Sequence, residues 1–333
     1  MSLFGQPDIA ALKAARDANG LIKALRHDEV REGAVAALVD LGPTSVKPLL
    51  DAVSPDENAA VQSAVAAALR DLAAASHSSF KSALRDHDVH ERKSAVMGLA
   101  ALGPEHAVPL LSLALSDTKT GVRIAAEALL AAWASPKSVR GLRFALLRLV
   151  RGTDEFDQQH ELPVLVTALT AVGDEAAIRA LADGMVKSTS VTCMGQTKGA
   201  LVTFGSAAVT AVGEALDDAG ENKQAVFYAL DFFRVVKDPG GVAFVARLLD
   251  HSDSLVRETA IETLGTIGGG PVIPPLLRAL DDGSKSVRRT AAHTLGKHGD
   301  ASAVPALEKI AAEDSWTVRR AAAKALKQIA KRC

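Results

Sequence analysis

Three stretches of the sequence share one pattern: VRETAIETLGTIG (256–268), VRRTAAHTLGKHG (287–299) and VRRAAAKALKQIA (318–330). In each stretch a Val-Arg pair precedes a run of small residues that contains a leucine. Apolar residues recur every three or four positions, which indicates a helix with one buried face. The stretches follow one another at intervals of 31 residues, so they predict a repeated helical unit.

The same pattern continues, less clearly, through most of the chain. With the last residue of each copy as a marker, ten copies follow at intervals of 30 to 32 residues, apart from one interval of 39. The markers are Gly42, Ala73, Gly103, Ala134, Gly173, Gly205, Val236, Gly268, Gly299 and Ala330. Because one unit cannot bury its apolar face alone, neighbouring units must stack around a continuous core.

Each unit predicts two helices, named here helix A and helix B, with the marker at the end of helix B. Val256, Ala260, Leu264 and Ile267 form the apolar stripe of helix B in the eighth unit. The marker Gly268 suits a helix C-terminus, where φ can turn positive. Pro271 then opens the next helix A, in a turn where its missing N–H has no cost.

The motif D-x-x-V-R-x-x-A-x-x-x-L-G at 253–265, followed by Val-Pro-x-Leu as at 108–111 and 304–307, resembles the HEAT repeat. It is most similar to the phycobilisome-lyase type of HEAT-like repeat, and the resemblance covers about residues 19–331. It implies an all-α fold, a right-handed α-solenoid (an armadillo-like superhelix) of about ten helix-turn-helix repeats. Scaffolds, lyases, hydroxylases and DNA glycosylases all use such repeats, so the resemblance predicts the fold more specifically than the function.

The sequence predicts one solenoid over residues 1–333. Its parts are an entry helix (1–18), regular repeats (19–134), degenerate central repeats (135–237) with an insertion near 151–161, and regular repeats with a basic cap (238–333). No apolar run reaches the ~18 residues that a membrane helix needs. The start lacks a basic region followed by an apolar one, and two cysteines favour a reducing compartment. We therefore expect a cytoplasmic protein.

Composition and motifs exclude several other classes. Hydrophobic residues make up 48% of the chain, but only 9 Phe, 2 Trp and 1 Tyr are aromatic, which suits closely packed helices better than a β-sandwich. The net charge of −1 argues against a general nucleic-acid binder. We find no phosphate loop, nucleophile elbow or dinucleotide fingerprint. We expect no catalytic residue and no cofactor.

An arginine stands eleven residues before the marker in six units: Arg31, Arg92, Arg123, Arg257, Arg288 and Arg319. Such a row is compatible with anion binding. However, an arginine near a helix N-terminus opposes the helix dipole and needs a carboxylate partner. The resemblance supplies one in the turn between the helices, as at Asp28, Asp253 or Asp314. We favour a structural ladder.

Residues ten, six and two positions before each marker lie on one ridge of helix B, because residues four apart share a helix face. The ridge is polar in units eight to ten and therefore faces solvent; the resemblance places it on the concave side. In units three to seven small and apolar residues replace the charges. There we expect a partner helix or peptide to bind, at Lys93, Met97, Ile124, Thr167, Gly195, Gly199, Thr203, Val226, Leu230 and Arg234. The alternative is a register that is wrong by one residue, with the aromatic residues of 133–244 filling a wider core.

The C-terminal end of the chain is basic. Residues 285–333 contain 11 Lys and Arg and 4 Asp and Glu, a net charge of +7, against −8 for the rest of the chain. The ridge residues Arg289, His293, Lys297, Arg320 and Lys324 are candidates to hold an acidic partner. Solubility of a terminal repeat is the alternative explanation.

Two histidine clusters suggest metal binding, DHDVHE at 86–91 and the pair His160-Glu161. Related deoxyhypusine hydroxylases bind two irons through His-Glu pairs from several repeats. Here only two pairs occur, each one helical turn too early, and they lie about 20 Å apart at ~10 Å per layer. We therefore expect no metal site. Cys193 has no histidine or carboxylate beside it, and we expect it to be buried and unreactive.

The sequence thus favours a non-catalytic scaffold or adaptor that binds a protein partner along helix B, and neither a membrane nor nucleic acid. The alternative is a lyase- or isomerase-type enzyme accessory subunit that acts on a chromophore or a modified protein. That alternative predicts a deep pocket with convergent polar groups near the aromatic residues of 144–244. A metal-dependent enzyme is the third hypothesis.

Overall fold

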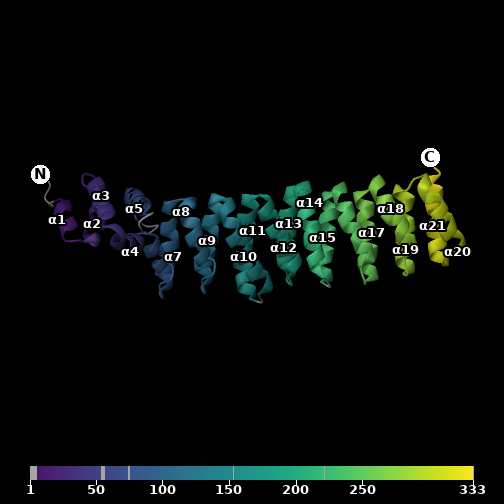
Figure 1. Ribbon diagram of the computed structural model, residues 1–333, viewed down its shortest axis with the longest axis horizontal. Helices are drawn as coiled ribbons and strands as arrows, with labels where there is room; N and C mark the ends of the chain where they lie inside the picture. The colour runs from purple at the N-terminus through teal and green to yellow at the C-terminus, as the bar shows by residue number, and fades with distance from the viewer. Residues whose placement is uncertain (1–5, 54–56, 74–75, 153, 221, 333) are drawn as a thin grey trace. The chain divides into compact units, whose positions relative to one another are not determined.

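The computed structural model describes residues 6–53, 57–73, 76–152, 154–220 and 222–332, and all regular structure in these ranges is helical (Figure 1). The helix-B segments are α3 (Arg31–Asp40), α5 (Ala59–Leu72), α7 (Val89–Leu99), α9 (Thr120–Trp133), α11 (Glu155–Val172), α13 (Val191–Phe204), α15 (Lys223–Val236), α17 (Ser254–Ile267), α19 (Lys285–His298) and α21 (Trp316–Ile329). The helix-A segments are α2 (Ala18–Ala24), α4 (Val46–Asp51), α6 (His77–Ala83), α8 (Pro104–Ala114), α10 (Val139–Arg151), α12 (Glu175–Lys187), α14 (Val209–Leu216), α16 (Val242–Arg247), α18 (Ile273–Arg278) and α20 (Val304–Glu313). The predicted ten helix pairs are therefore present within the described ranges.

An entry helix precedes the first pair. It is α1 (Ile9–Ala14), which begins at Asp8, whose side chain accepts a hydrogen bond from the Ala11 N–H. The chain turns at Arg16, with φ 55°, before α2 begins. Residues 1–5 of the predicted entry helix lie outside the described residues.

The helices form two compact units, residues 1–145 with 155–172, and residues 146–154 with 173–333. Within each unit most consecutive helix-B segments pack against one another, as α7 does against α9 and α17 against α19. This is the stacking that the repeat predicts. A single solenoid over the whole chain stays a prediction.

The apolar stripe of helix B forms the core of each unit. In α17 the side chains of Val256, Ala260 and Leu264 are fully buried, and Ile267 is partly buried. Asp253 begins this helix by accepting a hydrogen bond of 2.7 Å from the Leu255 N–H. Such caps satisfy N–H groups that have no partner within the helix. Asn58, Asp88, Ser190 and Asn222 do the same for other helix-B segments.

A left-handed residue follows seven of the described helix-B segments. These residues are Gly42, Gly103, Ala134, Gly173, Gly205, Lys237 and Gly268, with φ from 46° to 74°. Six of the seven are predicted markers. In unit seven the left-handed residue is Lys237, so the predicted marker Val236 is wrong by one residue. The ridge of α15 shifts by one position accordingly, to Phe227 and Asp231, which are partly buried, and Val235, which is exposed.

Lys237 is strained in this position, because a side chain at φ 54° clashes with its own backbone whereas glycine does not. We expect Lys237→Gly to raise the free energy of unfolding by about 1 kcal/mol, since the exposed side chain contributes no packing. The measurement is a urea unfolding curve. Lys237→Ala is the control, and equal stability of the two variants would contradict the assignment.

One segment, Val191–Ala219, is long and apolar enough to cross a membrane by length and composition alone, with a mean hydropathy of 1.4. This criterion is a mean over a window, whereas the sequence-based expectation concerned an uninterrupted apolar run, which Gln196 and Lys198 break in this segment. The segment contains two helices, α13 and α14, separated at Gly205, where φ is 56°. Half of its most apolar window is buried inside the protein. The segment is therefore better described as one helical turnaround of the repeat than as a single spanning helix.

The predicted insertion near 151–161 extends helices more than it lengthens a loop. Helix α10 has 13 residues and α11 has 18, and only 152–154 separate them. Thr153 lies outside the described residues. The first two turns of α11 carry Asp157 and Glu161, which both contact Arg123 of α9.

Candidate functional site

The arginines of the Val-Arg pairs connect each helix B to the next repeat. Three of them form two-bond ion pairs with an aspartate of the following turn: Arg92 with Asp117 (2.6 Å), Arg257 with Asp282 (2.7 Å) and Arg288 with Asp314 (2.6 Å). Each guanidinium also donates to its own turn, as Arg257 Nη1 does to the His251 carbonyl at 2.8 Å. The hydrogen bonds from Arg288 lower the pKa of Asp314 to about 2. The predicted structural ladder is confirmed, and the charge of each of these arginines is already neutralised by an aspartate.

The other members of the row differ in their partners. Arg31 pairs with Asp28 of its own turn, and Arg123 pairs with Asp157 and Glu161. Arg319, in the last repeat, is exposed. The predicted partner Asp253 binds Lys223 instead of an arginine.

The histidine clusters have structural roles. Glu161 is fully buried and accepts from Arg123 Nε at 2.8 Å, while His160 is exposed beside it. Asp88 caps α7 by accepting from the His90 N–H at 2.8 Å. Across the described ranges, no three histidine, cysteine or acidic side chains gather in a group that could hold a metal ion.

Cys193 is fully buried, as predicted. Burial raises the pKa of its thiol, which disfavours the reactive thiolate. The side chain is part of the packing of α13.

The ridge predicted to bind a partner is exposed in units three to six. Lys93, Met97, Thr167, Gly199 and Thr203 are exposed, and Ile124 and Gly195 are half-buried. In unit seven only Arg234 is exposed. Val226 and Leu230 are buried, with 1% and 0% of their surface accessible, so their predicted place on the ridge is wrong. The cause is the marker at Lys237, which turns both side chains into the core.

The aromatic residues of the central repeats contribute to that core. Phe232 and Phe233 of α15 are fully buried, and their rings meet edge to face with centroids 5.4 Å apart. Phe233 also stacks on Phe244 at 6.5 Å. The alternative hypothesis of a shifted register with aromatic core filling is therefore confirmed for unit seven.

Met97 borders an apolar depression of about 400 Å³ between α5 and α7. Val65 and Leu69 of α5 line it together with Ala100 and Ala101, which follow α7. The exposed fraction of Met97 is 37%. On the predicted ridge, a small cavity and an exposed large apolar side chain therefore coincide at Met97.

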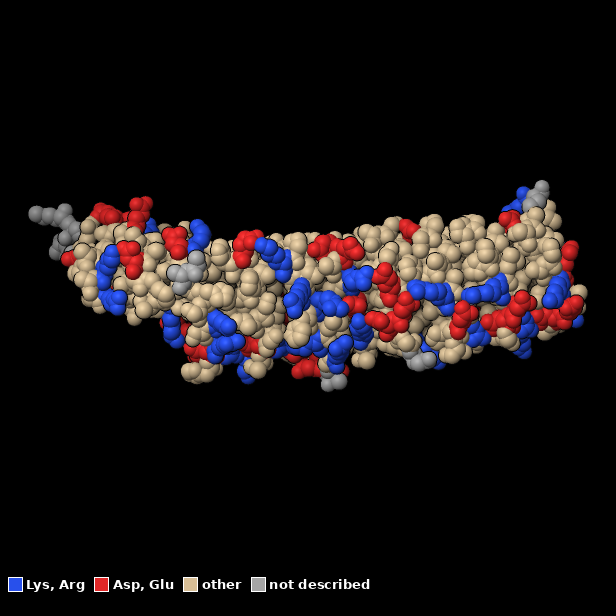
Figure 2. All heavy atoms as spheres, viewed as in Figure 1, with Lys and Arg blue, Asp and Glu red and all other residues tan. Residues whose placement is uncertain are grey.

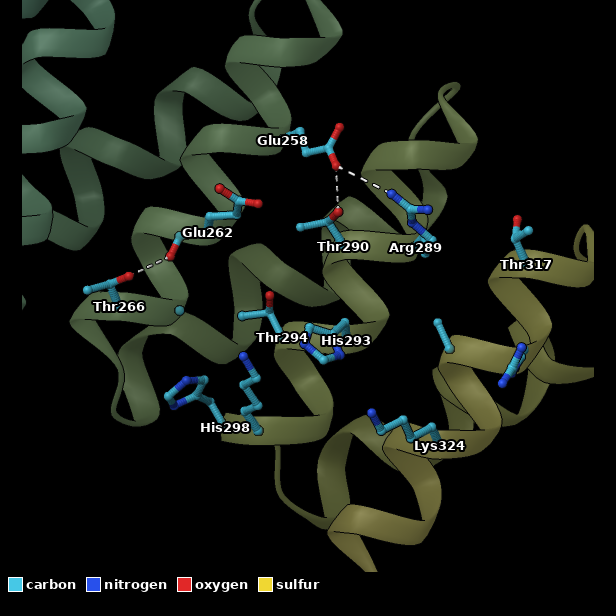
Figure 3. Close-up of a pocket in the computed structure, with 14 residues that line it drawn as sticks. Glu258, Glu262, Thr266, Arg289, Thr290, His293, Thr294, His298, Thr317 and Lys324 are labelled. Atoms are coloured by element: carbon cyan, nitrogen blue, oxygen red, sulfur yellow. Dashed lines mark hydrogen bonds and ion pairs between the residues drawn. The ribbon is translucent and has the colours of Figure 1, made fainter.

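A larger groove, of about 780 Å³, lies between α17, α19 and α21 (Figure 3). All five residues predicted to hold an acidic partner line it: Arg289, His293, Lys297, Arg320 and Lys324. Small residues beneath it allow α19 and α21 to approach closely. A Cβ added to Gly296 would lie 2.9 Å from the Ala325 Cα, so a larger residue would force the helices apart. We name this cavity the C-terminal groove.

The cations of the C-terminal groove are unequally compensated. Glu258 accepts a hydrogen bond from Thr290 at 2.9 Å and lies 3.9 Å from Arg289. Within the described ranges, Lys297 and Lys324 have no ion-pair partner. Arg320 lies over the ring of Trp316, 5.5 Å from its centroid. The groove therefore holds positive charge that the chain does not neutralise.

His293 reports this excess charge. Burial lowers its pKa below the usual value, and Lys297 and Lys324 lower it further. Because one lysine comes from α19 and the other from α21, cations from two repeats act on the same point. The lowered pKa favours the neutral imidazole, and a bound anion would raise this pKa.

Sequence reasoning missed the hydroxyl groups of the C-terminal groove. Thr290 and Thr294 line it, each one position after a ridge residue, and Thr317 of α21 joins them. A step of one residue rotates a side chain by about 100° around the helix, toward the neighbouring helix. Their role thus depends on the direction in which the repeats stack, which the ridge alone does not give.

On the face shown in Figure 2, residues of both charge signs lie interspersed in a band along the lower part of the C-terminal repeats. The stacked two-helix units and their arginine ladder define an α-helical repeat protein. Models of HEAT repeats match residues 209–282 and 241–327, and a model of the PBS lyase HEAT-like repeat matches residues 91–117. These matches confirm the predicted resemblance to HEAT repeats over residues 91–117 and 209–327.

Solved structures of similar fold have low sequence identity to the chain. An engineered protein is 22% identical, with 97% of this chain and 96% of that chain covered and a TM-score of 0.34. Human deoxyhypusine hydroxylase is 18% identical, with 77% and 96% covered and a TM-score of 0.35. A TOG-domain structure of microtubule polymerases is 12% identical, with 97% and 93% covered and a TM-score of 0.39. No curated protein matches the chain.

Proposed function

We propose that the chain is a non-catalytic scaffold or adaptor that binds an acidic segment of a protein partner in the C-terminal groove. The observation that carries this proposal is the convergence on one groove of Lys297, Arg320 and Lys324, which form no ion pair with the carboxylates that also line it. Uncompensated charge in a concave site attracts a ligand of opposite sign and concentrates the field around it. The paired ladder arginines cannot supply such a charge.

The groove also offers contacts that a peptide uses. The exposed Thr317 hydroxyl can donate to or accept from a peptide backbone, and Thr290, which donates to Glu258, can still accept. Trp316 beside the groove is 64% exposed and is held by the Arg320 guanidinium. An exposed aromatic ring of this kind provides a large apolar contact at the edge of a polar site.

The depression at Met97 is proposed as a second, apolar contact for the same class of partner. Its walls come from α5 and α7 of the first compact unit. It is small, so it suits one inserted side chain of a partner helix or peptide. The lyase-type alternative predicts a pocket among residues 144–244, whereas the C-terminal groove lies outside that range. The proposed setting is the cytoplasm.

A charge-neutralising double variant tests the proposal. We expect Lys297→Gln with Lys324→Gln to weaken binding of the labelled peptide Glu-Ala-Ala-Glu-Ala-Ala-Glu about tenfold at low salt, because each exposed ion pair contributes up to about 1 kcal/mol. Fluorescence anisotropy measures the affinity. In parallel, NMR titration of wild-type His293 should show a pKa that rises when the peptide is bound.

The matched control is Lys309→Gln with Lys327→Gln. It removes the same charge from exposed positions of α20 and α21 that do not line the groove. We expect its affinity to stay within about twofold of wild type, because distant surface charges are screened. Equal losses in both double variants, or an unchanged His293, would contradict binding in the groove.

A further inference from the structure

The charges of the C-terminal groove are segregated by helix. Helix α17 contributes the carboxylates of Glu258 and Glu262, whereas α19 and α21 contribute the cations. Figure 3 shows Glu262 and Lys324 on opposite sides of His293. The groove is therefore negative along one wall and positive along the other two helices.

Of the two carboxylates, Glu262 is the one available to a ligand. The Glu258 carboxylate already accepts a hydrogen bond from Thr290 and forms an ion pair with Arg289. Glu262 is exposed, and its carboxylate makes no ion pair or hydrogen bond within the described ranges. A uniformly acidic segment that crosses all three helices would meet this carboxylate with like charge. Such a pair is unfavourable.

The spacing of the helices sets the spacing of the ligand charges. Packed helices lie about 8 to 10 Å apart. A segment in the polyproline II conformation advances about 3.1 Å per residue with three residues per turn, so residues three apart share one face and lie over neighbouring helices. A segment that crosses from α17 to α21 therefore presents residues 1, 4 and 7 to Glu262, to Lys297 and to Lys324.

We infer that the C-terminal groove selects a dipolar segment of its protein partner, with a basic residue over Glu262 and acidic residues three and six positions away. This inference rests on the proposed function and specifies its ligand. It predicts the opposite of simple attraction to a basic groove, which favours the segment with the largest negative charge. The two explanations therefore give different orders of affinity.

Two peptides separate them: Lys-Ala-Ala-Glu-Ala-Ala-Glu and Glu-Ala-Ala-Glu-Ala-Ala-Glu. We expect the wild-type chain to bind the lysine peptide about fivefold more tightly, because an attractive surface pair replaces a repulsive one. In Glu262→Lys the order should invert. Glu308→Lys makes the same charge change on an exposed residue of α20 outside the groove and should keep the wild-type order.

The outcomes are distinguishable by anisotropy, with circular dichroism to check that each variant is folded. A preference of wild type for the all-glutamate peptide, or none between the two, overturns the dipolar selection and leaves the proposed acidic ligand in place. Binding of neither peptide overturns the proposed function itself. An unchanged order in Glu262→Lys overturns the assignment to Glu262.

Discussion

Leu230→Asp is expected to lower the free energy of unfolding of the compact unit that contains residues 173–333 by at least about 4 kcal/mol, or to prevent its folding. The Leu230 side chain is fully buried between helices, and α15 packs there against both α13 and α17. A carboxylate at this position loses its hydration without gaining a partner. On the predicted ridge, by contrast, the same substitution would leave the helices intact and affect only partner binding.

Val235→Asp is the matched control for this prediction. Val235 lies on the same helix, on the corrected ridge, and 52% of its surface is exposed. Its substitution removes little buried area, and an acidic residue near the helix C-terminus costs about 0.5 kcal/mol. Urea unfolding followed by circular dichroism measures both variants. Similar stabilities for the two variants would show that the register based on Lys237 is incorrect.

The sequence did not reveal this register because unit seven lacks the glycine that marks the end of helix B in six other units. Lys237 adopts the left-handed conformation in its place, at a steric cost that no composition rule anticipates. Helix α15 also carries apolar residues around much of its circumference, as in Phe232-Phe233 followed by Val235. A stripe that is apolar in two registers does not choose between them.

Where a glycine ends helix B, the sequence predicts correctly which residues of the helix face outward. The marker at Gly268 and the strict repeat interval fix which residues of α17, α19 and α21 face outward, and the five predicted basic ridge residues all line the C-terminal groove. Their convergence follows from the stacking of equivalent positions in successive repeats. The charge balance of the groove, in contrast, depends on which cations form ion pairs, and those contacts are visible only in the three-dimensional structure.

The network around Arg123 shows the same limit for contacts across the insertion. Sequence spacing groups Glu161 with its neighbour His160, but the structure pairs it with Arg123, 38 residues earlier. In the regular repeats the arginine reaches an aspartate 25 or 26 residues later. The longer α10 and α11 replace that turn by the first two turns of a helix, so the ladder partner there is a glutamate.

Arg123→Met is expected to lower the free energy of unfolding of the N-terminal unit by about 4 kcal/mol, because it leaves buried carboxylates without their cation. The Arg123 side chain is 5% exposed and the Glu161 side chain 0%. Arg123 Nη2 also lies 2.7 Å from Asp157, and Nη1 donates to the Asp117 carbonyl at 2.8 Å, so one residue joins α9 to α11 and to the preceding turn.

Arg31→Met provides the comparison, because Arg31 has the same position within its repeat as Arg123. Both residues belong to the compact unit of residues 1–145 and 155–172. Its partner Asp28 is 86% exposed and keeps its hydration when the arginine is removed. We therefore expect a loss of only about 1 kcal/mol, typical of an exposed pair. Urea unfolding of both variants measures the difference. Equal losses would mean that the burial of the acidic partners has no effect on stability. They would contradict a structural role for the Arg123 network beyond that of the other ladder arginines.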